Sequence, residues 1–307
     1  MRNLKQIILV NALLLILLSG CAKDEKLMDM KEDLKGLTLN LTIPQIETGI
    51  SRAVLPDAGE STLNNVYILF YAPGDNMPTL FYSEQIKAED SWSHSFGVQS
   101  ISKLKDGITY DVYVLANLSE DRGGVKVPTN SMDRYNLLNL NDSRCYCEDE
   151  SDISFSGLGT FTKTPQIGVT ENGTLTIALQ RLMARIDIEL SGNIQMEGYS
   201  VESVWIENAP AYSPFFVGGK RKVGRAVISE GSMIGNFVRF YSLENAASTL
   251  AEEQLTVGIL LRDALGNIKV FRSQIEDAIE RNKIYQIQIE LDLTTTRIGR
   301  MALKPLW

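Results

Sequence analysis

Apolar and polar residues alternate one by one along several short stretches of the chain. Residues 37–43 read Leu-Thr-Leu-Asn-Leu-Thr-Ile, and residues 175–179 and 186–190 keep the same period of two. Residues 66–71 and 109–117 are instead mostly apolar or aromatic. Strict alternation predicts strands with one buried face, and short apolar runs predict strands inside a sandwich core. The pattern therefore predicts a chain built almost wholly of β-strands.

The second half continues this pattern, with turn residues between the strands. We expect turns at residues 105–107, at residues 172–173 (Asn-Gly) and at residues 263–267, because glycine and asparagine accept the backbone angles that tight turns need. We also expect one helical turn over residues 275–280. Short strands with frequent turns favour an antiparallel sandwich. The strands expected in this half are residues 201–206, 237–242, 255–261, 268–272 and 285–293.

Two regions set the domain organisation that we predict. Residues 174–190 hold two alternating stretches that together exceed the usual length of one strand. We interpret them as a chain that leaves one sheet and enters another, and we divide the chain there into domains 37–183 and 184–307. Residues 119–163 are polar and weakly periodic, so we expect a long excursion between two strands, with a short helix near residues 131–139.

The chain begins with the pattern of a signal peptide over residues 1–20. Arg2 and Lys5 precede an apolar run at residues 7–18, which is too short to span a bilayer. Leu-Ser-Gly then comes directly before Cys21, as cleavage by a lipoprotein signal peptidase requires. Several acyl chains on one cysteine give stable membrane attachment. We therefore expect a lipoprotein lipidated at Cys21; the alternative is an ordinary signal peptide with an incidental cysteine.

Residues 21–36 are polar and have no apolar face to bury, so they predict a flexible tether. Within them, Lys-Asp-Glu-Lys at residues 23–26 resembles the charged export tag that follows the lipidated cysteine in surface lipoproteins of the Bacteroidota. We expect a protein anchored in the outer membrane by its lipid and displayed at the cell surface.

Composition argues against several classes of function. The chain has 30 basic and 38 acidic residues, a net charge of −8, which removal of Arg2 and Lys5 would change to about −10; such a charge disfavours nucleic-acid binding. His94 is the only histidine and lies in an alternating run, which favours a place on a strand face over a catalytic triad. Cys145 and Cys147 are too close for an unstrained disulfide and too few for a zinc site. We expect no enzyme, no metal and no cofactor.

Four segments, in their order along the chain, resemble the fimbrillin-like proteins of the Bacteroidia, the subunits of type V pili. They are residues 37–43 followed by Ser51-Arg52-Ala53-Val54 and the strand to residue 71, residues 110–117 ending in Ala-Asn, residues 175–190, and residues 240–245 with 281–287. The resemblance covers roughly residues 37–290. It implies two tandem transthyretin-like antiparallel β-sandwich domains.

The resemblance also implies a mechanism of assembly. In that family an Arg-specific protease cuts an Arg-Ala junction and releases the first strand, and a donor strand from the neighbouring subunit fills the emptied groove. For this chain it implies cleavage between Arg52 and Ala53. The partners implied are other fimbrial subunits, the protease, and the outer membrane through the lipid. The apolar side chains of the implied displaced strand are Leu37, Leu39, Leu41 and Ile43.

Three alternatives remain open in the sequence. Residues 301–307 are apolar enough for a donor segment, although Pro305 restricts strand pairing and a plain final edge strand fits equally well. Anchor, shaft and tip subunits are all compatible with the chain. The second class of function is a surface glycan-binding lipoprotein, which needs an exposed aromatic platform; Trp92 and Trp205 are candidates, although their alternating strands favour burial.

Overall fold

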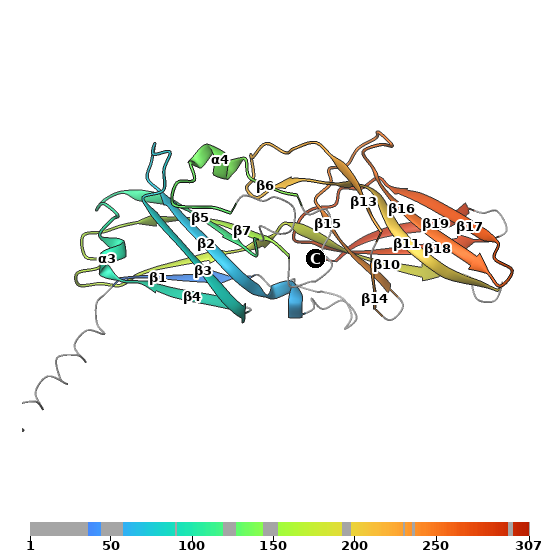
Figure 1. The fold of residues 1–307 in the computed structure, drawn as a ribbon, viewed down its shortest axis with the longest axis horizontal. Helices are drawn as coiled ribbons and strands as arrows, with labels where there is room; N and C mark the ends of the chain where they lie inside the picture. Colours follow the sequence, from blue (N-terminus) through green and yellow to red (C-terminus); the bar gives the residue numbers. More distant parts are fainter. Residues whose placement is uncertain are drawn as a thin grey trace, which may run out of the picture.

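The computed structural model describes residues 36–43, 58–89, 91–118, 127–143, 153–191, 198–229, 231–234, 237–293 and 297–306. These residues are mostly β-strand, and they form two packed pairs of sheets that follow one another along the long axis of the molecule (Figure 1). The predicted all-β sandwich class is therefore confirmed.

The first pair of sheets is built from strands up to Arg181, except that the short strand Asn141–Asp142 (β6) pairs instead with Ser213–Pro214 (β12). One sheet has the strand order β4-β1-β8, and the other has the order β3-β2-β5-β7-β9. Their facing side chains make a core that includes the fully buried rings of Phe70, Phe96 and Phe155. The elements are β1 (Leu37–Thr42), the 3₁₀ helix η4 (Ala58–Ser61), β2 (Leu63–Tyr71), β3 (Leu80–Glu89), β4 (Ser91–Phe96), α3 (Val98–Ile101), β5 (Thr109–Ala116), α4 (Arg134–Leu138), β6 (Asn141–Asp142), β7 (Phe155–Thr162), β8 (Gly173–Ala178) and β9 (Gln180–Arg181).

The second pair of sheets starts at Met183. Its strand orders are β14-β15-β10-β18-β19 and β13-β11-β16-β17. A second core lies between them, with Phe240 and Phe271 as its largest fully buried side chains. The elements are β10 (Met183–Ser191), β11 (Tyr199–Pro210), β12 (Ser213–Pro214), β13 (Arg225–Ile228), β14 (Ser232–Ile234), β15 (Phe237–Leu243), β16 (Leu255–Asp263), β17 (Ile268–Ile275), β18 (Ile284–Asp292) and β19 (Arg297–Leu306).

The two pairs of sheets repeat one strand order. In the first, β1 lies between an antiparallel partner, β4, and a parallel partner, β8. In the second, β10 lies between an antiparallel partner, β15, and a parallel partner, β18. The opposite sheets also correspond, because β2 lies between β3 and β5 as β11 lies between β13 and β16. The strand β1 therefore occupies in the first sandwich the central place that β10 occupies in the second.

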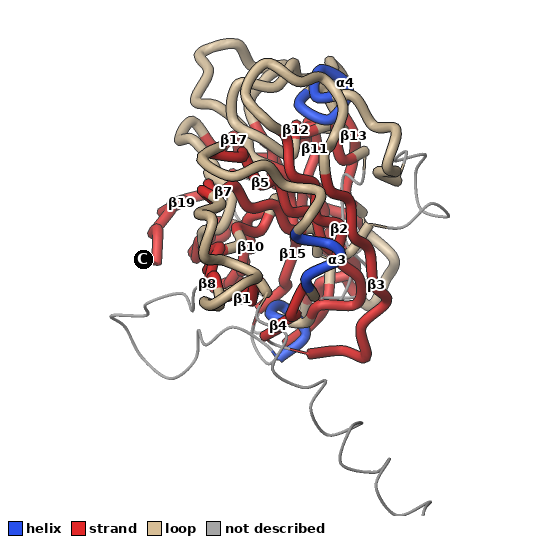
Figure 2. The backbone as a smooth tube through the Cα atoms, turned by 90° about the vertical axis from the view of Figure 1, so that its left-hand side faces the viewer, coloured by secondary structure: helices blue, strands red, loops and turns tan. Residues whose placement is uncertain are grey.

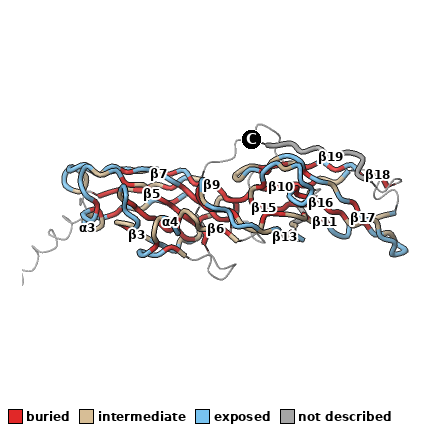
Figure 3. Tube along the Cα trace, turned by 90° about the horizontal axis from the view of Figure 1, so that it is seen from above, coloured by how far each residue is buried: buried red, intermediate tan, exposed pale blue. Residues whose placement is uncertain are grey.

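Residues of the second half complete the core of the first sandwich. Phe215, Phe216, Tyr241 and Leu243 belong to the first hydrophobic cluster, although they follow the start of β10. The ring of Phe216 meets that of Tyr113 edge to face at 5.0 Å. Figure 3 shows buried residues through the middle of the molecule as well as within each sandwich. The two sandwiches therefore pack against each other through these apolar side chains, and we call this contact the shared seam.

The strand β7 corrects the expectation of an excursion over the whole of residues 119–163. It pairs along its full length with β5 and closes one side of the core. Its low hydrophobicity reflects Gly157 and Gly159: a Cβ atom at either position would lie within 3 Å of the Ile177 side chain on β8. The glycines let the two sheets approach, so the low hydrophobicity of β7 comes from close packing at Gly157 and Gly159 as well as from the exposed Thr160 and Thr162. The expected short helix is α4.

Two smaller expectations also change. Residues 275–280 contain no helix; Ile279 forms a bridge with Asn245 instead. Gly173 is the first residue of β8, and the turn lies earlier, at Gly168, which has a φ of 85°. The predicted turns at Gly107 and Gly266 are confirmed, with φ of 74° and 86°. The expected change of sheet after β8 is also observed, through β9 into β10.

Candidate functional site

The strand β1 forms the middle of its three-stranded sheet. It pairs with β4 from Leu37–Phe96 to Thr42–Ser91, and with β8 from Leu37–Gly173 to Thr42–Ala178. Figure 2, which looks along the molecule from its first sandwich, shows β1 between β4 and β8 at one side of the body. Both edges of β1 are therefore occupied by hydrogen-bonding partners.

The period of two in β1 places its leucines in the core. Leu37, Leu39 and Leu41 are 0%, 0% and 1% exposed, and Ile43 packs partly buried against the same cluster. The intervening side chains lie on the outer face, where the Asn40 Oδ1 atom accepts a hydrogen bond of 2.7 Å from Ser93 Oγ. Burial of three leucines is worth about 5–9 kcal/mol in total. These leucines fill the position between β4 and β8, which we call the seat of β1, and any strand in this seat needs apolar side chains at the same alternate positions.

The ends of β1 are held as well. The Gly36 N–H donates to Asn172 Oδ1 at 2.9 Å, and the Thr42 carbonyl accepts from the Leu179 N–H at 2.8 Å. If β1 were absent, both β4 and β8 would present unpaired N–H and C=O groups around an apolar slot. Such a slot is unfavourable in water until another strand enters it.

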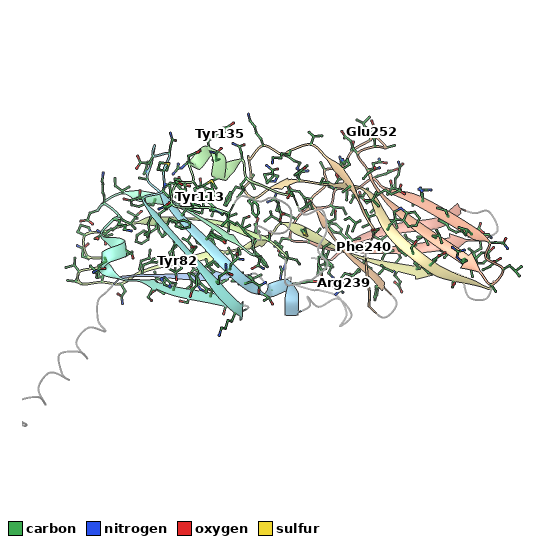
Figure 4. The ribbon with its side chains drawn as sticks, viewed as in Figure 1. Tyr82, Tyr113, Tyr135, Arg239, Phe240 and Glu252 are labelled. Atoms are coloured by element: carbon green, nitrogen blue, oxygen red, sulfur yellow. The ribbon has the colours of Figure 1, made fainter. Side chains whose placement is uncertain are left out.

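Aromatic side chains line the β4 side of the seat. His94, directly opposite Leu39, stacks on Trp92 with ring centroids 5.5 Å apart. The ring centroid of Tyr82 on β3, which Figure 4 labels, lies 4.1 Å from that of His94. The Tyr82 hydroxyl is 3.0 Å from His94 Nδ1, and Glu84 accepts a hydrogen bond from Trp92 Nε1 at 3.0 Å. Burial lowers the pKa of His94 below its ordinary value. This cluster supports the strand that borders β1.

After β1, the described chain resumes at η4. Arg52 and Ala53 lie outside the described residues, whose next segment begins at Ala58. Glu60, on η4, is 1% exposed. It accepts hydrogen bonds from Arg185 Nη1 at 2.8 Å and from the Tyr241 hydroxyl at 2.7 Å. The segment that follows the candidate junction is therefore attached to two strands of the second sandwich.

Glu60 belongs to a larger buried cluster, which we call the seam cluster: Glu60, Arg181, Arg185, Asp187, Arg239 and Tyr241. Asp187 and Arg239 are directly opposite on β10 and β15, and Arg239 Nε donates to Asp187 Oδ1 at 2.7 Å. Arg185 Nη2 donates to Asp187 Oδ2 at 2.8 Å. Figure 4 shows Arg239 at the first-sandwich end of the second sandwich. The cluster thus places three guanidinium groups around two carboxylates.

Burial and pairing act in opposite directions on these groups. Burial raises the pKa of Asp187, against the effect of its bonds with Arg185. Burial also opposes the charge of Arg185, but its bonds with Asp187 and Glu60 outweigh this and raise its pKa above the usual range. Because breaking a buried pair leaves an uncompensated charge, such a cluster tolerates the loss of one member poorly.

The C-terminal strand β19 lies at the edge of the second sandwich. It pairs antiparallel with β18 from Ile284–Leu306 to Asp292–Arg297, and Pro305 stands opposite Tyr285 at the far end. A proline is tolerated there because an edge strand needs only one row of hydrogen bonds. In the described residues, β19 is therefore a final edge strand of its own sandwich.

The remaining sequence candidates divide into described and undescribed positions. Trp92 is 7% exposed within the first core, so it offers no platform for sugars. Trp205 is half-buried and lies across Gly258, where a Cβ atom would come within 2.1–2.5 Å of its indole. Cys21, Cys145 and Cys147 lie outside the described residues.

The described residues contain neither a candidate metal site nor a candidate membrane-spanning helix. No group of three or more His, Cys, Asp or Glu side chains in this part of the chain is placed to hold a metal ion. No helix within the same residues is long and apolar enough to cross a membrane.

Comparison with known proteins places this fold. No protein-family model matches the chain, and no curated protein sequence matches it. A candidate cell adhesion protein from Parabacteroides distasonis superposes with a TM-score of 0.63 at 15% identity, over 89% of this chain and 97% of that chain. The tip fimbrial protein Mfa3 from Porphyromonas gingivalis gives a TM-score of 0.56 at 10% identity, over 88% and 99%.

A fimbrial assembly protein from Parabacteroides distasonis gives a TM-score of 0.55 at 13% identity, over 88% of this chain and 94% of that chain. The chain therefore has the two-sandwich fold of these cell-adhesion and fimbrial proteins. The resemblance to fimbrillin-like proteins, drawn from four short segments, is supported at the level of the whole fold.

Proposed function

We propose that this protein is a non-enzymatic subunit or anchor of a cell-surface fimbrium, and that it joins other fimbrial subunits by exchange of a β-strand. The proposal rests mainly on one observation: β1 supplies the middle strand and three buried leucines of a sheet, yet the chain connects it to the body only through residues 44–57. Those residues include Arg52 and Ala53. One cut there would make β1 a separate peptide.

The structure of the sheet supports release followed by replacement. A cut peptide is held by non-covalent contacts alone, so a competing strand of similar pattern can take its place. The competitor must satisfy two rows of backbone hydrogen bonds and fill three leucine sites in alternate positions. These requirements select an alternating apolar strand from a second subunit.

We propose the part of β19 before Pro305 as the segment that this chain lends to its neighbour, because a central strand needs both rows of hydrogen bonds and proline has no N–H to donate. Strand β19 is ten residues long, it lies at a sheet edge, and it is joined to β18 by residues 293–296. An edge strand can leave without disturbing a strand on its far side. The strands β10 and β18 could not leave in this way, because each lies between two other strands of the sheet.

The membrane attachment belongs to the same proposal. Cys21 would carry the lipid, residues 22–36 would form the tether, and the body would comprise domains 37–183 and 184–307. If Arg52 is cut, the lipid leaves with β1 and the body becomes a shaft subunit. If it is not cut, the protein remains an anchor in the outer membrane. Mass spectrometry of the N-terminus from native cells distinguishes these two forms.

The test is controlled proteolysis of the chain without its leader. Digestion with an Arg-specific protease should give a body that begins at Ala53, lose β1 when competing subunits are added, and form oligomers that resist mild denaturant. Arg52→Lys keeps the charge but removes the cleavage site, so this variant should stay monomeric under the same treatment. A wild-type protein that is cut at Arg52 and still stays monomeric would refute strand exchange.

A further inference from the structure

The segment on the body side of the candidate junction has an attachment of its own. Glu60 lies eight residues after Arg52, and η4 is where the described chain resumes after β1. Its side chain accepts from Arg185 and Tyr241, both on the second sandwich. Its main-chain carbonyl accepts from Arg181 Nε at 2.8 Å. Side chain and backbone are thus held by separate donors.

The next residue extends this attachment. Ser61 Oγ accepts from Arg181 Nη2 at 2.9 Å, and Arg181 Nη1 donates to Asn282 Oδ1 at 3.0 Å. Arg181 therefore connects η4 to the loop before β18. Every side chain of the seam cluster is buried, so water competes little for the hydrogen bonds within it, whereas Ser61 and Asn282 are only partly buried.

The attachment of η4 is independent of β1. The partners of β1 lie on β4, on β8 and at Asn172 and Leu179 on either side of β8, whereas those of Glu60 lie on β9, β10 and β15. Loss of β1 removes none of the contacts of Glu60 described above. The two sides of the junction are therefore held at different places by different chemistry: apolar side chains in a sheet on one side, and buried charges on the other.

We propose that Glu60 is a positioning residue that keeps the cut end of the body seated on the second sandwich when β1 leaves. This inference rests on the proposed function, because it gives the charged cluster a role in strand release. Glu60 ensures that proteolysis frees only the chain before the junction, and that the seam between the sandwiches is the same before and after exchange. A neighbouring strand then enters the groove between β4 and β8 while η4 keeps its contacts with β10 and β15.

Hydrogen exchange of the uncut chain tests the clamp without reference to cleavage. In Glu60→Gln the side chain keeps its size but loses its charge, which leaves three guanidinium groups with one carboxylate. Amides of residues 58–62 should exchange at least about tenfold faster than in the wild type, as expected from loss of a buried charged hydrogen bond. Glu202→Gln is the matched control: it removes an exposed carboxylate that pairs with Arg262 in the second sandwich, so the exchange rates of residues 58–62 should stay at their wild-type values.

A milder variant covers the case in which Glu60→Gln does not fold. Tyr241→Phe removes one donor to Glu60 and leaves every charge in place, so it should accelerate the same amides by a smaller factor. Wild-type exchange rates at residues 58–62 in both variants would overturn the proposal.

The second part of the test asks whether η4 keeps its contacts when β1 leaves, and it uses an inserted cleavage site so that the result does not depend on cleavage at Arg52. Residues 50–55 are replaced by the recognition sequence of a sequence-specific protease, and the chain is cut and mixed with an excess of β1-like peptide carrying a mass label. Residues 37–42 should exchange for the labelled peptide while residues 58–62 keep their protection. Protection lost together at both places would overturn the positioning role, whereas failure of subunits to polymerise would count only against strand exchange.

Discussion

Leu39 stands at the centre of β1, with a partner strand on each side and a fully buried side chain. Leu39→Ala should lower the free energy of unfolding of the first sandwich by about 2–5 kcal/mol, because it removes apolar contacts and leaves a cavity. Thr42→Ala, on the exposed face of the same strand, should change it by no more than about 0.5 kcal/mol. Urea titration of the uncut chain measures both values. Equal effects would mean that β1 is not seated as described.

His94 links the stability of the β4 side to pH. Burial lowers its pKa, so folding favours the neutral imidazole. Its contribution to stability is therefore complete above pH of about 6.5 and is lost as pH falls through the lowered pKa of the folded state. His94→Gln removes the only imidazole of the chain. We expect the wild type to lose more stability than this variant between pH 7.5 and 5.5 in paired urea titrations, and an equal loss would contradict this role.

At the level of elements, β19 lies at the edge of a sheet in the second sandwich, whereas β1 lies in the middle of a sheet in the first. Deletion of residues 294–307 removes an edge strand and exposes the hydrogen-bonding groups of β18. We expect the second sandwich to become less stable and more prone to self-association, while the first sandwich keeps its hydrogen-exchange protection. Size-exclusion chromatography with peptide-level exchange measures both. Loss of hydrogen-exchange protection in β1 or β4 would contradict the expectation that β19 stabilises only the second sandwich.

The period of two was sufficient to predict β1 and β10, and short apolar runs were sufficient to predict β2 and β5, because each of these strands buries one or both faces in a core. It was not sufficient for β7, whose glycines are required by the approach of Ile177 from the other sheet. No local pattern reports a contact made by a residue distant in the sequence. The strand was therefore assigned to an excursion.

Glu60 was missed for the same physical reason. Its partner Arg185 is 125 residues away, and a lone glutamate between a loop and a strand has no distinguishing pattern. One signal was present: Asp187 lies on the predicted strand 186–190 and Arg185 directly precedes that strand, so extending the strand by one residue places both side chains on one face, where they can pair. Opposite charges at that spacing, with apolar residues in the alternate positions, would have indicated an ionic contact on that face.

For the molecule as a whole, the shared seam couples the two sandwiches. Phe215 belongs to the second half of the chain but is 1% exposed in the core of the first sandwich. Phe215→Ala should destabilise the first sandwich by about 3–5 kcal/mol. Phe271→Ala is the matched control, because its ring lies wholly within the second core. Peptide-level hydrogen exchange of both variants should show protection lost in different sandwiches, and an effect of Phe215→Ala confined to the second would contradict the shared core.

The direction of β1 has a mechanical consequence. In Figure 1 the strands β1 and β4 run along the long axis of the molecule. Tension applied along that axis would load a strand in this seat parallel to its own length, and the bonds of its ladder lie across that direction. All of them then bear the force at once instead of opening one after another. A joint of only six residues should therefore rupture abruptly at high load, and a fibre built from such joints should be stiff until it breaks.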